Sequence, residues 1–243
     1  MNLIDRTAYA TPLRKLDPAY KAGFSLLVLI LCLVLNRPLV GAVAAAWMWI
    51  LSIWWAQLPA SLIRKVLLAE GIFLALSVAG VAVNIRFYPF FFGMTADGLD
   101  SALLLFTRAL GCASAMNFLA LTTPLVDLLD LGRRLRLAPL LLDLMTLIYR
   151  FIFTLLESME RMRTAQDARL GYSGFWRGMS SAGELAARLF VDAYQRSARV
   201  QIALEGRGYA GELRVLPAEY RRDRRVFVLA AIVTLSMFFV WSL

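Results

Sequence analysis

Residues 167–174 read DARLGYSG, and residues 205–211 read EGRGYAG, a second copy that is shorter by one residue. Each copy follows a helix-like run, and their arginines are Arg169 and Arg207. Glycine stops a helix and the last-turn carbonyls favour a cation, so each copy predicts a helix end that presents an arginine to a negative groove. Two similar helix ends suggest a partner that comes in two copies. Two ordinary solvated helix C-termini are the alternative.

The composition around this repeat is that of a membrane protein. Hydrophobic residues make up 60% of the 243 residues, and the mean hydropathy is +0.66. The excess of 26 Lys and Arg over 17 Asp and Glu could suggest nucleic acid, but the apolar runs favour a bilayer with the charge on one side. The chain has no histidine, the commonest transition-metal ligand and general base. Cys32 and Cys112 fall inside apolar runs and imply no disulfide framework. The segment 1–21 is too polar for a cleavable signal peptide.

Five apolar stretches predict the fold class, an all-α integral membrane protein with about five transmembrane helices. The last of them is just long enough to cross ~30 Å of hydrocarbon at ~1.5 Å per residue. Asp17 followed by Pro18 predicts the start of the first helix, and an aromatic interfacial loop is expected over 87–93. The stretches cover about 20–35, 39–58, 66–83, 98–121 and 226–243. Residues 1–121 are therefore predicted as a membrane region with four spans, 122–225 as cytoplasmic or interfacial coupling helices, and 226–243 as the final span.

The distribution of Lys and Arg predicts the topology. With a cytoplasmic N-terminus, the cytoplasmic side holds four before the first span, two between the second and third, and 17 within 122–225. The outside holds Arg37 and Arg86, and Arg108 lies inside a span. This asymmetry follows the positive-inside rule. We therefore expect a multi-pass protein of the bacterial inner (cytoplasmic) membrane with its N-terminus in the cytoplasm.

Residues 122–225 predict amphipathic helices. A long helical run covers 140–166, with its apolar residues three or four positions apart, and a second helix covers about 180–204. The segment 140–156 is apolar enough for a sixth span, but Asp143 and Arg150 share nearly one face of it. Crossing there would also place 13 arginines outside. We therefore interpret this segment as interfacial or at most partly embedded.

Charged residues in the predicted spans and at the helix bends allow other interpretations. Glu70 and Arg108 are costly in lipid unless they face protein, so they form a structural pair or line a contact with another subunit. Asp127 and Asp130 could hold Mg²⁺ in a membrane-embedded enzyme, although their leucine neighbours fit an amphipathic helix better. No nucleophile–base pair and no Gly-rich phosphate loop with Lys-Ser/Thr is present. We expect no catalytic residues, no metal site and no cofactor in this chain.

Several segments, in chain order, together carry a resemblance: Leu16–Lys21, Thr122–Pro124, Leu135–Pro139, Met145 with Tyr149–Phe151, and Arg196–Val200 leading to Gly206–Tyr209. They resemble the transmembrane (T) component of energy-coupling-factor (ECF) ABC transporters, most closely the cobalt-type CbiQ branch. The two arginine copies correspond to the family's Ala-Arg-Gly-like motifs, with Leu170 before Gly171 in the first and Gly206 in place of Ala in the second. The residues that the resemblance assigns to ATPase coupling are Ala168, Arg169, Gly171, Tyr172, Gly206, Arg207, Gly208 and Tyr209.

The resemblance implies a non-catalytic scaffold of an importer, most closely one for cobalt ions. It would join two ABC-type ATPases, each taking one coupling arginine in a groove, to a separate substrate-binding membrane (S) component. The S component is expected to hold the metal, because this chain offers no imidazole. An apolar stripe on the first long helix is either a deformable surface for that component or the core of a helical hairpin: Ile152, Leu155, Met159 and Met162. A T component for nickel or a vitamin, a membrane enzyme and a secondary carrier are the alternatives.

Overall fold

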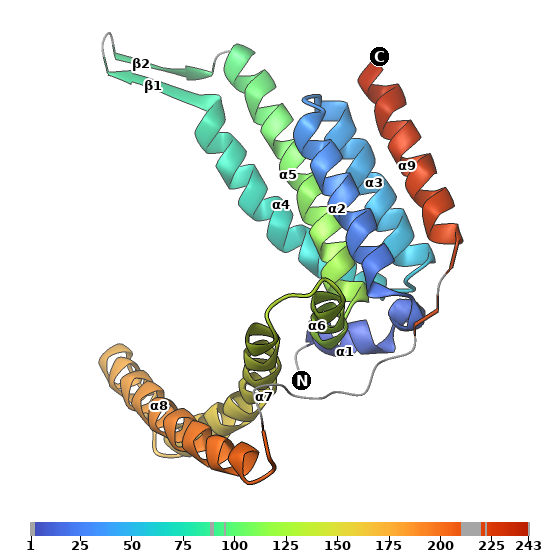
Figure 1. Ribbon diagram of the computed structural model, residues 1–243. Helices are drawn as coiled ribbons and strands as arrows, with labels where there is room; N and C mark the ends of the chain where they lie inside the picture. Colours follow the sequence, from blue (N-terminus) through green and yellow to red (C-terminus); the bar gives the residue numbers. More distant parts are fainter. Residues whose placement is uncertain (1–2, 88–89, 95, 210–219, 222, 243) are drawn as a thin grey trace. The chain divides into compact units, whose positions relative to one another are not determined.

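The computed structural model describes residues 3–87, 90–94, 96–209, 220–221 and 223–242, which are almost entirely helical (Figure 1). They fall into two units, Met1–Leu128 with Ala218–Leu243, and Leu129–Pro217. The chain therefore passes between the units twice, once inside α6 and once between Pro217 and Ala218. The elements are α1 (Leu3–Ala10), η1 (Pro12–Lys15), α2 (Pro18–Val34), α3 (Pro38–Trp54), α4 (Ala60–Ala82), β1 (Val83–Phe87), β2 (Phe90–Met94), α5 (Ala96–Thr122), α6 (Leu125–Arg134), α7 (Pro139–Asp167), α8 (Phe175–Glu205) and α9 (Arg225–Ser242).

The helices of the first unit match the predicted spans and confirm an all-α membrane protein. Within the described ranges, three helices are long and apolar enough to cross a membrane: α5, α7 and α9. The apolar helices α2 and α3 have 17 residues each, the short end of what a span needs. The length and composition of α7 would thus allow a crossing, and the interfacial placement of 140–156 stays a prediction. The division of the chain into membrane and cytoplasmic regions also stays a prediction.

The helix starts have the expected local causes. The Asp17 carboxylate accepts a hydrogen bond from the Ala19 N–H at 3.0 Å, which satisfies one of the free donors at the start of α2. Pro18, Pro38 and Pro139 each occupy the first position of a helix, where the missing N–H costs nothing and the fixed φ suits the helix.

The core of the first unit lies where α3 packs against α5, with α2 and α9 alongside (Figure 1). The two backbones approach closely at Gly41 and Gly111. A Cβ on Gly41 would collide with the Thr107 carbonyl, and a Cβ on Gly111 would lie 2.8 Å from the Gly41 oxygen. Small residues let helices approach in this way inside membranes. The Met48 side chain next to this contact is fully buried.

The predicted aromatic loop after α4 is instead an antiparallel hairpin. Strand β1 pairs with β2 over Val83–Phe87 and Phe90–Met94. Aromatic and β-branched residues favour extended backbone, and the pairing satisfies the backbone groups that the two strands turn toward each other. Residues 88–89, the tip of that predicted loop, lie outside the described residues. The hairpin is the one departure from helix among the elements of the described chain.

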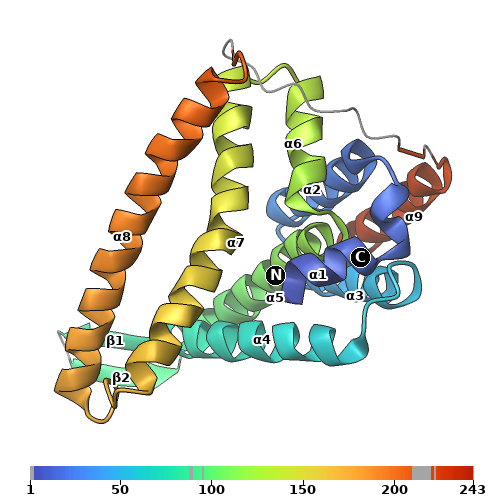
Figure 2. The ribbon, with the colours of Figure 1, turned by 90° about the horizontal axis from the view of Figure 1, so that it is seen from below.

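The second unit is built on two antiparallel helices, α7 and α8, that lie side by side (Figure 2). One stripe of α8 is half-buried, while no residue of this helix is fully buried. The half-buried apolar residues of that stripe recur at the spacings that the sequence predicted: Leu185, Leu189, Ala193, Val200 and Leu204. The helix begins at Phe175, earlier than the predicted start near 180.

Candidate coupling site

The first arginine segment forms the C-terminal end of α7. Leu170 has a φ of 57°, the left-handed conformation that ends a helix. The Gly171 N–H donates to the Gln166 carbonyl at 2.9 Å, and the Leu170 N–H donates to the Asp167 carbonyl at 2.9 Å. These two bonds define a Schellman motif, which satisfies carbonyls that the last turn leaves free. Arg169, the residue before the left-handed position, is exposed.

The second arginine segment ends α8 in the same way. Gly208 has a φ of 72°. The Tyr209 N–H donates to the Leu204 carbonyl at 3.0 Å, and the Gly208 N–H donates to the Glu205 carbonyl at 3.0 Å. Arg207, directly before the left-handed glycine, is exposed. The two helices therefore end in the same backbone motif with an arginine at the same position.

The two copies correspond residue by residue when Arg169 is aligned with Arg207. In this alignment both hydrogen bonds of the first motif have their counterparts in the second, so Leu170 takes the place of Gly208. The letters Gly-Tyr stand at 171–172 and at 208–209, but in the backbone motif Gly171 corresponds to Tyr209 and not to Gly208. The left-handed position decides the match, and in the first copy a leucine occupies it at a cost of about 1–2 kcal/mol. Ala210 and Gly211 of the predicted second copy lie outside the described residues.

Side chains brace the first helix end against the start of α8. The Gln166 Nε2 donates to the Ser181 carbonyl at 2.9 Å, and the Ser181 hydroxyl donates to the Gly171 carbonyl at 2.9 Å. The Tyr172 hydroxyl donates to the Gln166 Oε1 at 2.8 Å. A Cβ on Gly171 would lie 2.8 Å from the Ser181 Oγ, too close for a side chain. Ala168, one residue before the arginine, keeps helical backbone and is exposed.

A long-range hydrogen bond braces the second helix end. The Tyr209 hydroxyl donates to the Asp143 carboxylate at 3.1 Å, and Asp143, near the start of α7, is buried. Desolvation and this carboxylate raise the pKa of Tyr209 above its ordinary value of 10. Gly206 has helical backbone, and a Cβ there would lie 3.4 Å from the Ile202 carbonyl, an ordinary contact. An alanine would therefore fit at Gly206.

The C-terminal ends of α7 and α8 lie at opposite ends of the helix pair (Figure 2). Arg169 follows the end of α7, next to the turn into α8, and Arg207 follows the far end of α8. Helix α8 has 31 residues, which at ~1.5 Å per residue separates the two positions by about 45 Å. Because a helix does not shorten, this separation is fixed by the fold.

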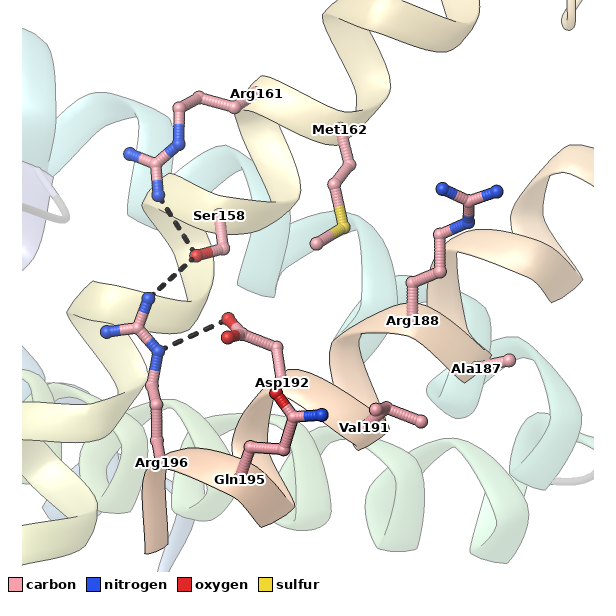
Figure 3. Close-up of a pocket in the computed structure, with 9 residues that line it drawn as sticks. All are labelled: Ser158, Arg161, Met162, Ala187, Arg188, Val191, Asp192, Gln195 and Arg196. Atoms are coloured by element: carbon pink, nitrogen blue, oxygen red, sulfur yellow. Dashed lines mark hydrogen bonds and ion pairs between the residues drawn. The ribbon is translucent and has the colours of Figure 1, made fainter. Parts of the chain in front are cut away.

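A basic groove of about 570 Å³ lies between α7 and α8 (Figure 3). The buried Ser158 hydroxyl accepts hydrogen bonds from Arg161 at 3.1 Å and from Arg196 at 3.5 Å. Arg196 also forms an ion pair with Asp192 at 3.2 Å. Arg188 has no ion-pair partner in the part of the chain that the structure describes. The lining residues are Ser158, Arg161, Met162, Ala187, Arg188, Val191, Asp192, Gln195 and Arg196.

The four residues of the stripe predicted to contact the S component differ in their exposure. Ile152 is exposed, whereas Leu155, Met159 and Met162 are half-buried. Met162 lines the α7–α8 groove (Figure 3). Part of the stripe thus belongs to the helix pair, and its use by a partner stays a prediction.

A second apolar face, which the sequence reasoning missed, lies on α8. Phe190, Tyr194 and Ile202 lie four or eight positions apart and are 73%, 71% and 69% exposed. The i, i+4 spacing places Phe190 and Tyr194 next to each other on the helix surface, and Ile202 lies about two turns further along. Their periodicity in the sequence was a usable signal, but only the structure shows that this face is uncovered within the second unit.

The charges predicted inside the spans do not pair with each other. The Asn117 side chain donates to the Glu70 carboxylate, joining α5 to α4. Arg108 donates to the Leu33 carbonyl at 2.6 Å, joining α5 to the end of α2. Each charge therefore has its own partner between neighbouring helices.

The acidic pair proposed for an enzyme is also divided between two structural roles. The Asp127 carboxylate accepts a hydrogen bond from the Tyr220 hydroxyl at 3.2 Å. Asp130 forms an ion pair with Arg134 at 3.3 Å on the same helix. Among the described residues, no group of three His, Cys, Asp or Glu side chains is placed to hold a metal ion.

A buried polar cluster, which the sequence analysis did not predict, joins several segments of the first unit, and we call it the Lys21 cluster. It comprises Lys21, Leu13, Thr122, Asp127 and Tyr220. The Lys21 ammonium is 1% exposed and donates to the carbonyls of Leu13 at 3.2 Å and Thr122 at 3.0 Å. The Asp127 carboxylate lies close enough to interact with its charge. The hydrogen bond from Tyr220 to Asp127 ties the segment before α9 to the start of α6.

A short parallel bridge reinforces the Lys21 cluster. The Arg221 N–H donates to the Lys15 carbonyl at 2.7 Å, and the Asp17 N–H donates to the Arg221 carbonyl at 3.2 Å. The chain leaves the first unit after Leu128 and returns at Ala218. Asp127, Tyr220 and Arg221, which lie close in the sequence to the two crossings, are thus held near the start of α2. A lysine one turn into an apolar helix was the sequence signal for this cluster.

Comparisons with known proteins agree with this architecture. The CbiQ family, described as cobalt transport protein, matches residues 10–217. The Cobalt transport protein CbiQ of Rhodobacter capsulatus is 35% identical over 161 residues, 66% of this chain and 65% of the relative. A Putative fused cobalt transport protein CbiMQ of Methanocorpusculum labreanum is 26% identical over 98% of this chain and 41% of its own length. The Energy-coupling factor transporter transmembrane protein EcfT of Staphylococcus aureus is 30% identical over 46% of each chain.

The family match and the apolar helices define a multi-pass membrane component of a transporter. The family match covers most of the chain, and the relatives include proteins named CbiQ and EcfT. The chain belongs to the CbiQ family of cobalt transport proteins.

Proposed function

We propose that the chain transmits ATP-driven motion from two ABC-type ATPase subunits to a separate substrate-binding membrane subunit of a cobalt importer. The observation that carries this proposal is the pair of equivalent helix ends that present Arg169 and Arg207. The names of the relatives support cobalt as the cargo and an ECF-type assembly. The fused CbiMQ relative supports a second membrane component working beside a CbiQ-like part.

Each arginine is suited to an acidic groove on an ATPase. A guanidinium offers five donors in a fixed fork and stays charged at any physiological pH. Arg169 and Arg207 are exposed and follow helix ends whose backbone is already satisfied. The helix end therefore does not need the arginine for its own stability. The guanidinium is free to bind a partner carboxylate.

The α7–α8 pair then acts as a stiff lever between two ATPase copies. Its docking points lie about 45 Å apart along one 31-residue helix. Side chains brace both ends, through Ser181 at the first and Asp143 at the second. When the ATPases close on ATP, the hairpin cannot shorten and moves as one body. Movement of the docking grooves is thereby converted into movement of the whole helix pair.

The covalent path from the lever to the membrane region passes through the Lys21 cluster. Asp127 lies just before the chain leaves the first unit and Tyr220 lies just after it returns, and the two side chains are hydrogen-bonded there, next to Lys21. This chain accordingly works without catalysis of its own, and ATP hydrolysis takes place on the partners.

The substrate-binding component contacts the apolar faces of the coupling helices. Ile152 on α7 and the Phe190, Tyr194 and Ile202 face of α8 offer exposed apolar surface. Such surface favours a partner membrane subunit, since large exposed apolar patches mark interaction sites. That partner also holds the cobalt ion. The protein resides in the inner membrane of a bacterial cell, and its N-terminus and residues 122–225 lie in the cytoplasm.

Co-purification of the tagged chain with the ATPases of its system tests the docking. The Arg169→Glu and Arg207→Glu double variant is expected to lose both ATPases, and each single variant is expected to lose one. Arg199→Glu is the matched control, because Arg199 is an exposed arginine on α8 away from either helix end. Equal retention of the ATPases by the wild type and the double variant would refute docking through these arginines.

Uptake measurements with the complete complex test the cargo. Cells that carry the complex are expected to accumulate radioactive cobalt, and the double variant is expected to lose this uptake. Uptake of nickel or a vitamin in place of cobalt would refute cobalt as the transported substrate and would leave the proposed coupling role standing. Substrate turnover by the purified chain alone, lost in Asp127→Asn, would instead establish an enzyme.

A further inference from the structure

A groove in the first unit lies where the end of α3 meets the start of α9. It has a volume of about 450 Å³ and opens to the surface. The two helices pack side by side at the edge of this unit (Figure 1). The groove is lined by Leu51, Trp54, Trp55, Arg225, Val228 and Leu229. None of these residues has a part in the coupling site.

The lining of the groove is apolar along its length. Leu51 is buried at 5% exposure and Leu229 is half-buried, whereas Val228 and Trp54 are 60% and 83% exposed. An indole ring as exposed as Trp54 at the end of an apolar helix suits the headgroup level of a bilayer, where one side of the ring is apolar and the N–H is wet. The groove therefore offers an apolar channel beside an aromatic rim.

The cation at the groove is Arg225. Its side chain is exposed and forms no ion pair within the described part of the chain. The neighbouring Asp223 carboxylate accepts a hydrogen bond from the Arg225 backbone N–H at 3.1 Å. That acid thus caps the start of α9. Arg221 and Arg224 are exposed close by along the chain and add to the positive charge.

The level of the groove follows from the ends of its helices. Helix α3 ends at Trp54 and α9, one of the helices long enough to span, begins at Arg225. The excess of Lys and Arg on this side assigns it to the cytoplasm. Anionic phospholipids give the cytoplasmic leaflet its negative surface potential, and basic pockets between spans on that side bind their headgroups.

We infer that this groove binds one anionic phospholipid of the cytoplasmic leaflet. The Arg225 guanidinium pairs with the lipid phosphate, a charge-assisted contact that its planar fork favours. The Trp54 and Trp55 rings border the glycerol level. An acyl chain lies along Leu51, Val228 and Leu229. The charge discriminates an anionic lipid from a zwitterionic one, and the apolar channel discriminates a lipid from free phosphate.

Tryptophan fluorescence of the full chain in nanodiscs tests the inference. Phosphatidylglycerol or phosphatidylcholine with brominated acyl chains is titrated into discs otherwise made of unlabelled phosphatidylcholine. Brominated phosphatidylglycerol is expected to quench at lower mole fraction than brominated phosphatidylcholine. Trp54→Phe, a change at an exposed position, is expected to remove much of that difference while the chain stays folded.

The charge is tested by Arg225→Gln, which is expected to weaken the preference for phosphatidylglycerol roughly fivefold, the worth of one basic residue near the surface. Arg37→Gln, an exposed arginine assigned to the other side of the membrane, is the matched control and is expected to leave the preference unchanged. Equal quenching by both lipids, or an unchanged preference in Arg225→Gln, overturns the inference. Displacement of the lipid by excess inorganic phosphate would show a site for free anions and overturns it as well. All these outcomes are independent of ATPase docking.

Discussion

Replacement of Lys21 by methionine tests the polar cluster that fastens the two connections of the first unit. The ammonium is 1% exposed and donates to the Leu13 and Thr122 carbonyls at 3.2 and 3.0 Å. Asp127 and Asp17 both interact electrostatically with it. Methionine has nearly the same length and volume, so Lys21→Met removes the charge and the two hydrogen bonds without opening a large cavity.

The magnitude follows from what the change leaves behind. Removal of one partner from a buried charged group costs about 3–5 kcal/mol, because the remaining charge keeps its desolvation penalty. The Thr122 carbonyl at the end of α5 also loses this donor, whereas the Leu13 carbonyl keeps the hydrogen bond from the Leu16 N–H. Folded proteins are stable by about 5–15 kcal/mol in total, so this loss is a large share. For a chain of this size we expect a fall in the melting temperature of about 10 °C.

Thermal unfolding in detergent, followed by size-exclusion chromatography, measures this fall. Lys65→Met is the matched control, since Lys65 is exposed, and its free energy of unfolding is expected to change by less than about 0.5 kcal/mol. Asp127→Asn in the Lys21→Met background is expected to recover part of the loss, because it removes a buried carboxylate that no longer has the nearby ammonium. A Lys21→Met variant that melts within about 2 °C of the wild type, which corresponds to about 1 kcal/mol, would refute the reasoning.

Three further changes test the coupling helices and the membrane core. Leu170→Gly is expected to raise the free energy of unfolding by about 0.5–1 kcal/mol, since glycine adopts a φ of 57° without strain; a lower melting temperature would contradict this. Tyr209→Phe is expected to speed amide exchange at the end of α8, because the hydrogen bond from the Tyr209 hydroxyl to Asp143 is lost. Because the pKa of Tyr209 is raised above 10, the hydroxyl keeps its proton and this hydrogen bond below pH 10, and loses both as the pH rises through that raised pKa. Amide exchange in the wild type is therefore expected to become as fast as in the variant only in strong alkali. Gly41→Val is expected to cost about 3 kcal/mol or more, because the Thr107 backbone cannot yield; near-normal yield and melting of that variant would contradict the close approach.

The sequence by itself determined the elements and the class of protein. Long apolar runs can bury their backbone hydrogen bonds only as helices in a bilayer, and Asp17 with Pro18 marks where one of them begins. The two arginine copies indicated two helix ends, because glycine and the end of an apolar stripe are local signals. Local signals are visible in a linear chain.

Tertiary structure decided how these parts are fastened together. Lys21 meets Thr122 across 101 residues, and Tyr209 meets Asp143 across 66, so neither pairing has a sequence period that could reveal it. The match between the arginine copies also depended on the backbone, since Leu170 and Gly208 share a left-handed φ but no side-chain character. Glu70 and Arg108 found separate partners because each contact is made with whichever helix packs nearest. The sequence fixes which polar side chains the protein has. Packing alone decides which of them are buried together, away from water, and must therefore form hydrogen bonds with one another.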